Sequence, residues 1–100
     1  MLPRNVADLV VQLRDRTERG EFTWHYDDNN AVVSLETQPF GISVEYDFNT
    51  IEEVGEFKII YRDNQENKIY HFSTDQRYND FEVARRLFDS AQASGLKFKF

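Results

Sequence analysis

The sequence contains no cysteine among its 100 residues, and this absence excludes several classes of protein. Without thiols there is no disulfide framework, no thiolate zinc site, no iron–sulfur cluster and no cysteine nucleophile. The chain also lacks a run of about 18 apolar residues, the length that a membrane-spanning helix needs. Its first residues do not open the long apolar stretch of a signal peptide. We therefore expect a cytoplasmic protein that begins at Met1.

Glycine is also scarce, with four residues at positions 20, 41, 55 and 95. A phosphate-binding loop needs several glycines within a short span, and these four are dispersed along the chain. No serine lies in a Gly-x-Ser-x-Gly sequence, which is typical of hydrolase nucleophiles. The sequence therefore favours neither a phosphate loop nor a serine nucleophile, and it predicts glycines at turns and helix ends.

The chain does have enough apolar material for one core. Hydrophobic residues make up 40% of the sequence and aromatic residues 15%. Full burial of a side chain the size of Phe or Leu stabilises a fold by roughly 1.5–3 kcal/mol. Because a chain of this length is too short for two separate cores, the sequence predicts a single domain over residues 1–100.

Two segments have the apolar period of an amphipathic helix. The first is predicted to begin with Asn5 as its N-cap and to end just before Gly20. The second is predicted to begin with Asn79 as its N-cap, to form a capping box with Glu82 and to end at Gly95. The apolar stripes of the two helices are Val6, Leu9, Val10 and Leu13, and Phe81, Ala84, Leu87, Phe88 and Ala91.

Between these helices the apolar period changes to two, which is typical of strands with one buried and one solvent-facing side. The predicted strands cover residues 22–26, 31–36, 42–48, 57–62 and 68–73. The polar segments between them include turns at 27–30 and 38–41 and a longer connection at 49–56. Since a parallel pair needs a crossover of about a dozen residues or more, these short connections predict an antiparallel meander with sequential strand order.

The order of the elements predicts an α+β fold. An N-terminal helix is followed by a five-stranded antiparallel meander sheet and a C-terminal helix, with both helices packed on one sheet face as a two-layer sandwich. The C-terminal tail alternates like a strand, so we expect it to join the sheet edge or to cover the core. A homodimer formed through Leu96, Phe98 and Phe100 is a further hypothesis.

His25 and His71 are the only imidazoles available for acid–base chemistry or metal binding. His25 is predicted to face solvent, and a metal site joining the histidines to the carboxylates at positions 27 and 28 is the weaker alternative. We therefore expect neither a metal nor a cofactor. His71, Tyr70 and Arg77 are the one group with suitable chemistry for a small-ligand or catalytic site, in the space between the sheet and the helices.

The distribution of charge is more informative than any motif. The formal net charge is −6, which disfavours direct binding of nucleic acid or of an anionic membrane. Residues 1–26 are neutral overall and residues 57–100 carry +2. Residues 27–56 contain eight acidic residues and no Lys or Arg, so this segment carries −8.

Six of these acidic residues are predicted to form an anionic patch on one sheet face and its rim: Glu36, Glu45, Asp47, Glu52, Glu53 and Glu56. Such a patch suits docking of a basic partner protein, with electrostatic steering that weakens in salt. The alternative is that these residues only keep a small sheet soluble and guard its edges.

The stretch from Leu13 to Trp24 has a helix that ends in Thr17-x-x-Gly20 and a Trp at the start of the sheet. This arrangement resembles small bacterial and phage proteins in which a helix, a strand meander and a final helix follow one another. These proteins have no settled activity, so the resemblance implies no catalytic residue. It implies a setting of bacterial conflict and mobile elements, where small acidic inhibitors, immunity proteins and nucleic-acid mimics occur.

The sequence thus predicts a protein that is not an enzyme but an interaction module. It would bind another protein with a basic surface through the acidic sheet face, as an inhibitor or immunity-type protein. The alternative is a small-ligand-binding or enzymatic domain that uses the cleft between sheet and helices near His71.

Overall fold

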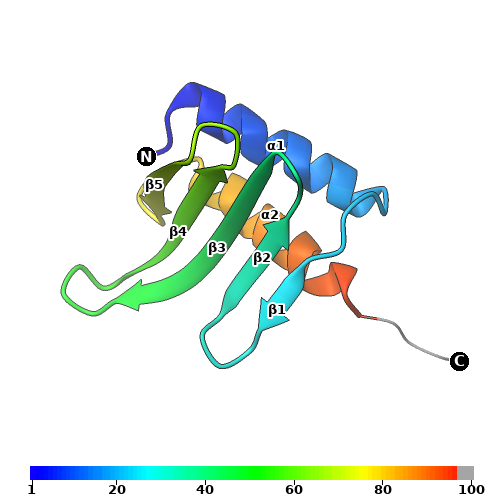
Figure 1. Ribbon diagram of the computed structural model, residues 1–100. Helices are drawn as coiled ribbons and strands as arrows, with labels where there is room; N and C mark the ends of the chain where they lie inside the picture. The colour runs from blue at the N-terminus through cyan, green and yellow to red at the C-terminus, as the bar shows by residue number, and fades with distance from the viewer. Residues whose placement is uncertain (97–100) are drawn as a thin grey trace, which may run out of the picture.

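The computed structural model describes residues 1–96, and its α+β fold confirms the predicted fold class. Five antiparallel strands form one open sheet in the sequential order β1-β2-β3-β4-β5, and both helices lie on the same side of that sheet (Figure 1). The elements are α1 (Arg4–Glu18), β1 (His25–Asp27), β2 (Val32–Glu36), β3 (Phe40–Asn49), β4 (Val54–Asp63), β5 (Lys68–Asp75) and α2 (Phe81–Ser94).

Helix α1 begins earlier than predicted, and the assignment of Asn5 as its N-cap is wrong. The N-cap is Pro3, whose carbonyl oxygen accepts the N–H groups of Val6 and Ala7 at 3.0 and 2.9 Å. A proline has no N–H to satisfy and its ring fixes φ, so it suits a helix start. At the other end Gly20 has a φ of +84°, the left-handed conformation that favours glycine.

The first strand is shorter than predicted, because only His25–Asp27 pair with β2. The N–H of Trp24 donates to Ser94 Oγ of α2 at 2.8 Å. Phe22 lies beneath the guanidinium of Arg16, whose carbon is 4.9 Å from the ring centroid. Phe22 and Trp24 therefore attach a loop to the two helices, and of the predicted aromatic row only Tyr26 lies in the strand.

Strands β3 and β4 are longer than predicted, and the predicted connection over residues 49–56 shrinks to residues 50–53. The predicted turn at 38–41 is shorter as well, since Phe40 and Gly41 already pair with β4. The short β3–β4 turn at residues 50–53 is possible because Asn49 Oδ1 accepts the N–H groups of Ile51 and Glu52, both at 3.0 Å. A side-chain acceptor of this kind closes a turn within a few residues.

Helix α2 begins one residue later than expected, and the predicted capping box of Asn79 and Glu82 is wrong. The residue before the helix is Asp80, and its side chain does not cap the helix. The Asp80 carboxylate instead accepts the Leu2 N–H at 2.6 Å and the hydroxyl of Thr74. The Glu82 carboxylate pairs with Arg85 at 2.7 Å. As predicted, the helix ends at Gly95.

The core lies between the inner face of the sheet and the two helices. Phe57 on β4 is the centre of an aromatic cluster, with ring centroids of Tyr46, Phe81 and Phe88 at 5.3, 5.1 and 5.4 Å. Among the described residues, every buried side-chain nitrogen or oxygen has a hydrogen-bond partner. Fully buried aliphatic residues come from both layers: Val10, Val33, Val44, Ile59 and Leu87.

Neither helix of residues 1–96 is long and apolar enough to cross a membrane. Leu96 follows the C-cap of α2 and is exposed. The expected strand-like tail and the hypothesis of a homodimer through Leu96, Phe98 and Phe100 depend on residues 97–100, which lie outside the described residues.

Candidate functional site

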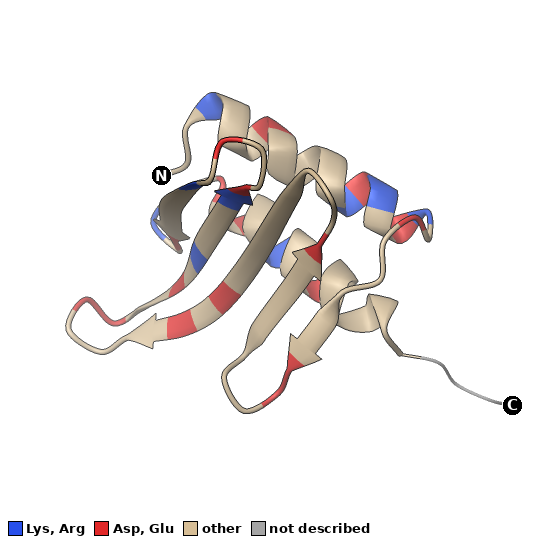
Figure 2. Ribbon diagram, in the orientation of Figure 1, with Lys and Arg blue, Asp and Glu red and all other residues tan. Residues whose placement is uncertain are grey.

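The side of the sheet opposite the helices, here called the open face, carries the clearest concentration of charge. No other element of residues 1–96 covers it (Figure 1). The strand register places six acidic and two basic residues on this face, which leaves a net charge of −4. They are Asp27, Glu36, Glu45, Asp47, Glu56 and Asp75, and Lys58 and Arg62. Figure 2 shows the acidic positions along β3 beside basic positions on β4.

Three of these carboxylates lie in one row across the sheet. Asp47 on β3 is opposite Glu56 on β4, and Glu56 is opposite Asp75 on β5. Like charges directly opposite one another destabilise a sheet. Lys58 offsets part of this repulsion, because its Nζ atom lies 3.5 Å from Asp47 Oδ2 and 3.8 Å from Glu56 Oε1.

Arg77, in the loop after β5, neutralises the end of this row. Its Nε and Nη2 groups donate to the two carboxylate oxygens of Asp75 at 3.0 and 2.8 Å, and its Nη1 group donates to Glu52 at 3.2 Å. Hydrogen bonds from the Arg77 side chain and backbone hold the pKa of Asp75 at about 2. Asp75 is therefore ionised over the whole physiological pH range.

At the other end of the open face, Glu36 on β2 pairs with Arg62 on β4 across the intervening strand β3. Gly41 of β3 lies directly beneath this ion pair. A Cβ atom at position 41 would be 2.5 Å from Glu36 Oε2 and 2.6 Å from Arg62 Nη2, so a side chain there would displace the pair.

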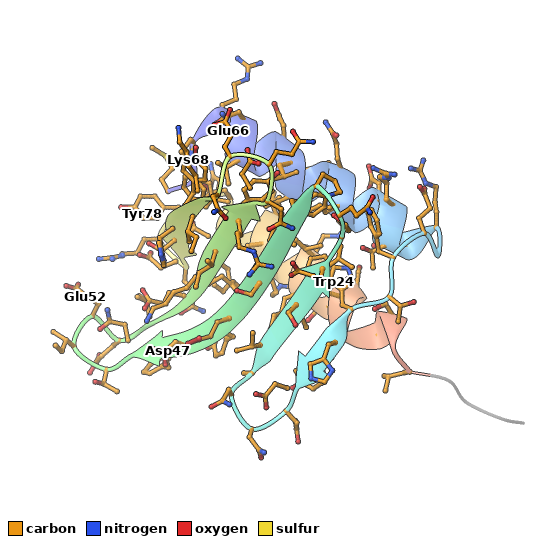
Figure 3. The ribbon with its side chains drawn as sticks, in the orientation of Figure 1. Trp24, Asp47, Glu52, Glu66, Lys68 and Tyr78 are labelled. Carbon is orange, nitrogen blue, oxygen red and sulfur yellow. The ribbon has the colours of Figure 1, made fainter. Side chains whose placement is uncertain are left out.

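The structure places all six residues of the predicted patch on the open face or on the β3–β4 turn that adjoins it. Figure 3 shows Asp47 and Glu52 at the same end of the sheet, away from Glu66 and Lys68. Four of the six have a basic partner: Glu36, Asp47, Glu52 and Glu56. Glu45 and Glu53 form no ion pair with any residue of the described chain.

The basic partners of the patch were missed in the sequence, although a signal for two of them was present. Lys58 and Arg62 alternate with the apolar residues of β4 and so belong on its solvent-facing side, next to β3. The third, Arg77, lies in a loop after β5, and no periodicity places it. The −8 segment contains no Lys or Arg in the sequence, but in the fold three cations from other segments lie beside it.

Two hollows lie on the open face. A shallow groove of about 290 Å³ crosses β3, β4 and β5 and is lined by Glu45, Lys58, His71 and Ser73, among others. A smaller hollow of about 150 Å³ lies between the Glu36–Arg62 pair and Ser43. The face can therefore receive protruding side chains of another molecule.

His71, Tyr70 and Arg77 are not brought together. His71 is exposed on the open face opposite Ile60, whereas Tyr70 is on the inner face and stacks on Phe72 at a centroid distance of 6.5 Å. The space between α1 and the sheet is lined by Tyr70 but not by His71. Arg77 is held by Asp75 and Glu52 as described above.

The second histidine, His25, is exposed on β1, as predicted. Asp27, two residues further along β1, accepts hydrogen bonds from the side chain and backbone of Asn30 and from the Asn29 backbone. These bonds lower the pKa of Asp27, and the bond from the Asn30 side chain has the largest effect. Over residues 1–96 no three His, Asp or Glu side chains gather closely enough to hold a metal ion.

The predicted strand over residues 42–48 is not buried on its apolar side along its whole length. Tyr46 and Phe48 continue the apolar alternation of β3, but they are 38% and 50% exposed. A ten-residue strand is about 33 Å long, whereas the 14-residue helix α2 is about 21 Å long, so the helix layer cannot cover the whole sheet. The lengths of the predicted elements were the signal that could have shown this.

Fold and surface together define an α+β two-layer domain with an acidic, uncovered sheet face. Comparisons with protein-family models, with curated proteins and with solved structures find no match to this chain.

Proposed function

We propose that this protein is a non-enzymatic interaction module that binds a basic partner protein through the open face of its sheet. The observation that carries the proposal is the net charge of −4 on a sheet face that no described helix covers. A surface dominated by one sign of charge attracts a partner of the opposite sign and accelerates their association.

Two features of the open face support this proposal. Glu45 and Glu53 have no cationic partner within the described residues, so they are available to a partner's Lys or Arg. The row of Asp47, Glu56 and Asp75 places three carboxylates on adjacent strands, which are about 4.8 Å apart. Arg77 neutralises Asp75, but Asp47 and Glu56 share the single cation Lys58. A cation from a partner would relieve the repulsion that remains and gain binding energy.

The form of this proposal that we favour is an inhibitor or immunity-type protein of a bacterium or phage, acting in the cytoplasm. It is supported by the resemblance of residues 13–24 to small proteins of that setting. The bound target would then be a protein whose own basic surface serves another ligand, and occupation of that surface would block it.

A pair of matched variants tests the proposal. Glu45→Gln/Glu53→Gln removes two negative charges from the open face and its rim, and Asp8→Asn/Glu66→Gln removes two from other exposed positions. Each variant is used to capture proteins from a cell extract at low and high ionic strength. We expect the first variant to lose the captured basic protein and the second to retain it, with less captured in high salt.

Equal loss in both variants would mean that only the total charge matters, and the carboxylates of the open face would then serve solubility alone. Capture that is insensitive both to salt and to Glu45→Gln/Glu53→Gln would contradict the proposal.

Binding of a small ligand is the second candidate, and the groove beside His71 is the observation that favours it. This groove brings Glu45, Lys58 and His71 together on the open face, outside the space between sheet and helices. A thermal-shift screen of small anions and zwitterions would test it. Any stabilising compound should lose its effect in His71→Ala and keep it in His25→Ala.

A further inference from the structure

The β3–β4 hairpin extends beyond both helices (Figure 1). Its end exposes apolar side chains. Tyr46 is 38% exposed, Phe48 50% and Ile51 90%. These three residues are here called the hairpin overhang. Tyr46 still packs against Phe57 at a centroid distance of 5.3 Å, so Phe48 and Ile51 are the members that project farthest from the core.

The hairpin is held rigidly from its β4 side. The Gly55 N–H donates to Gln76 Oε1 at 2.7 Å, and the Gln76 N–H donates back to the Gly55 carbonyl at 3.1 Å. The ring of Tyr46 lies over Gly55, where an added Cβ would be 2.7 Å from its hydroxyl oxygen. Arg77 and Glu52 add an ion pair at 3.2 Å. A backbone that is already fixed in place loses little entropy when its side chains bind a partner.

Carboxylates lie in the same hairpin as the overhang, with Asp47 and Glu56 on the open face and Tyr46 and Phe48 on the inner face of the sheet. Asp47 precedes Phe48 in the chain, Glu52 and Glu53 follow Ile51, and Glu56 lies opposite Asp47. This charge disfavours an anionic membrane as the covering surface, because the membrane and these carboxylates would repel each other. It also disfavours a second copy of the chain, since two acidic hairpins would meet. A protein with basic side chains around an apolar pocket is complementary both to the carboxylates of the hairpin and to its apolar side chains.

We propose that the partner protein binds the hairpin overhang in an apolar pocket bordered by Lys or Arg, with Phe48 and Ile51 as the anchoring side chains. The inference rests on the proposed function and adds the chemistry of the partner's site. Buried apolar anchors carry most of the energy of typical interfaces, while charges around them set orientation and association rate. The open face would thus guide the partner, and the hairpin would retain it.

Two synthetic helical peptides of equal length and charge serve as probes. The first has a stripe of Leu bordered by Lys, which reproduces an apolar surface with a basic rim, and the second has Ser in place of every Leu. Binding is measured by isothermal calorimetry and by amide chemical shifts. The proteins compared are the wild type, Phe48→Ser/Ile51→Ser, Glu45→Gln/Glu53→Gln, and the control Tyr78→Ser/Leu96→Ser, which removes two exposed large side chains outside the overhang and the open face.

We expect the Leu peptide to bind the wild type about tenfold to a hundredfold more tightly than the Ser peptide, because burial of one or two large apolar side chains has an effect of that order. Phe48→Ser/Ile51→Ser should remove this advantage and leave the weak binding of the Ser peptide unchanged. The control variant should bind both peptides as the wild type does. Shifts should centre on the amides of Phe48 and Ile51. All variants should keep the wild-type circular dichroism spectrum, since none of the substituted side chains is buried.

Equal affinity for the two peptides, with no effect of Phe48→Ser/Ile51→Ser, would overturn the anchoring role and leave the acidic open face as the binding surface. Failure of both peptides to bind at low salt, or binding unaffected by Glu45→Gln/Glu53→Gln, would contradict the proposed function itself. Sedimentation showing a wild-type dimer that Phe48→Ser/Ile51→Ser dissociates would assign the overhang to a second copy. Binding to phosphatidylcholine vesicles that depends on Phe48 would assign it to a membrane.

Discussion

The indole N–H of Trp24 donates a hydrogen bond to Thr17 Oγ1 at 2.9 Å, and both side chains are buried, at 3% and 5% exposed. This bond joins the last turn of α1 to the loop that leads into β1. When a buried donor loses its acceptor, the free energy lost by removing that donor from water is no longer offset by a hydrogen bond.

Substitution of Thr17→Val keeps the shape of the side chain and removes that acceptor. We expect a loss of about 1–3 kcal/mol in the free energy of unfolding, measured by urea denaturation with Trp24 fluorescence as the signal. Thr23→Val is the control, because Thr23 is exposed and should lose little. An unchanged midpoint for Thr17→Val would show that the indole finds another acceptor.

Asp80 joins three parts of the chain, since it stands before α2 and accepts hydrogen bonds from Leu2 and Thr74. Asp80→Ala should lower the free energy of unfolding by roughly 2 kcal/mol, because bonds to a charged acceptor are stronger than neutral ones. It should also accelerate hydrogen exchange of the Leu2 amide. Asp89→Ala removes an exposed carboxylate paired with Arg85 and should change stability by less than about 1 kcal/mol. Equal effects of the two substitutions would contradict this role of Asp80.

Asp75 and Arg77 predict how stability depends on pH. The pKa of Asp75 is lowered from 3.8 to about 2 in the folded protein. The unfolded chain therefore binds this proton at higher pH than the folded chain does. The contribution of the pair is complete above about pH 4 and is lost as the pH falls towards about 2.

Urea midpoints measured across that interval should consequently fall less steeply for Asp75→Asn than for the wild type. Arg77→Gln should also make the urea midpoint less dependent on pH in this interval, because it removes the group that lowers the pKa of Asp75. The double variant should show no further change. An unaltered slope in both single variants would exclude this pair as a source of the acid sensitivity.

The Glu36–Arg62 pair predicts an unusual response at Gly41. Gly41→Ala should separate the pair, because an added Cβ would lie 2.5 Å from Glu36 Oε2. Exposed ion pairs contribute at most about 1 kcal/mol, so the loss in the free energy of unfolding should be small. In a Glu36→Gln background the same substitution should be neutral or stabilising, since a glycine weakens a strand interior. A strictly additive cycle would show that Gly41 does not act through the pair.

The layered architecture could be predicted from the sequence because apolar periodicity reports burial directly. Ile42 and Val44 on β3, and Ile59 on β4, are buried as their alternation indicates. Apolar periodicity predicts the wrong element where a residue in a strand-like pattern forms hydrogen bonds to another part of the fold. Trp24 follows a strand pattern, but its N–H and its indole are both bound by helix residues, so the ladder of β1 starts one residue later.

Helix starts were misplaced because side-chain capping is a local rule and the competing partners are distant in sequence. Asp80 could not be connected to Leu2, which is 78 positions away, without the fold. The acidic patch was incomplete for the same reason. Its carboxylates all lie within residues 36–56, but the cations that pair with Glu36 and Glu52 come from β4 and from the loop after β5.

Trp24 and Ser94 are bonded although they are 70 positions apart, and Glu18 accepts a hydrogen bond from Ser90 across 72 positions. During synthesis, the sheet would thus leave the ribosome before α2 exists to cover its inner face. Apolar surface that stays exposed until a distant partner segment is synthesised makes a chain prone to aggregation. We therefore expect the nascent chain to need protection until its last helix is complete, and a stop codon before α2 should give an insoluble product.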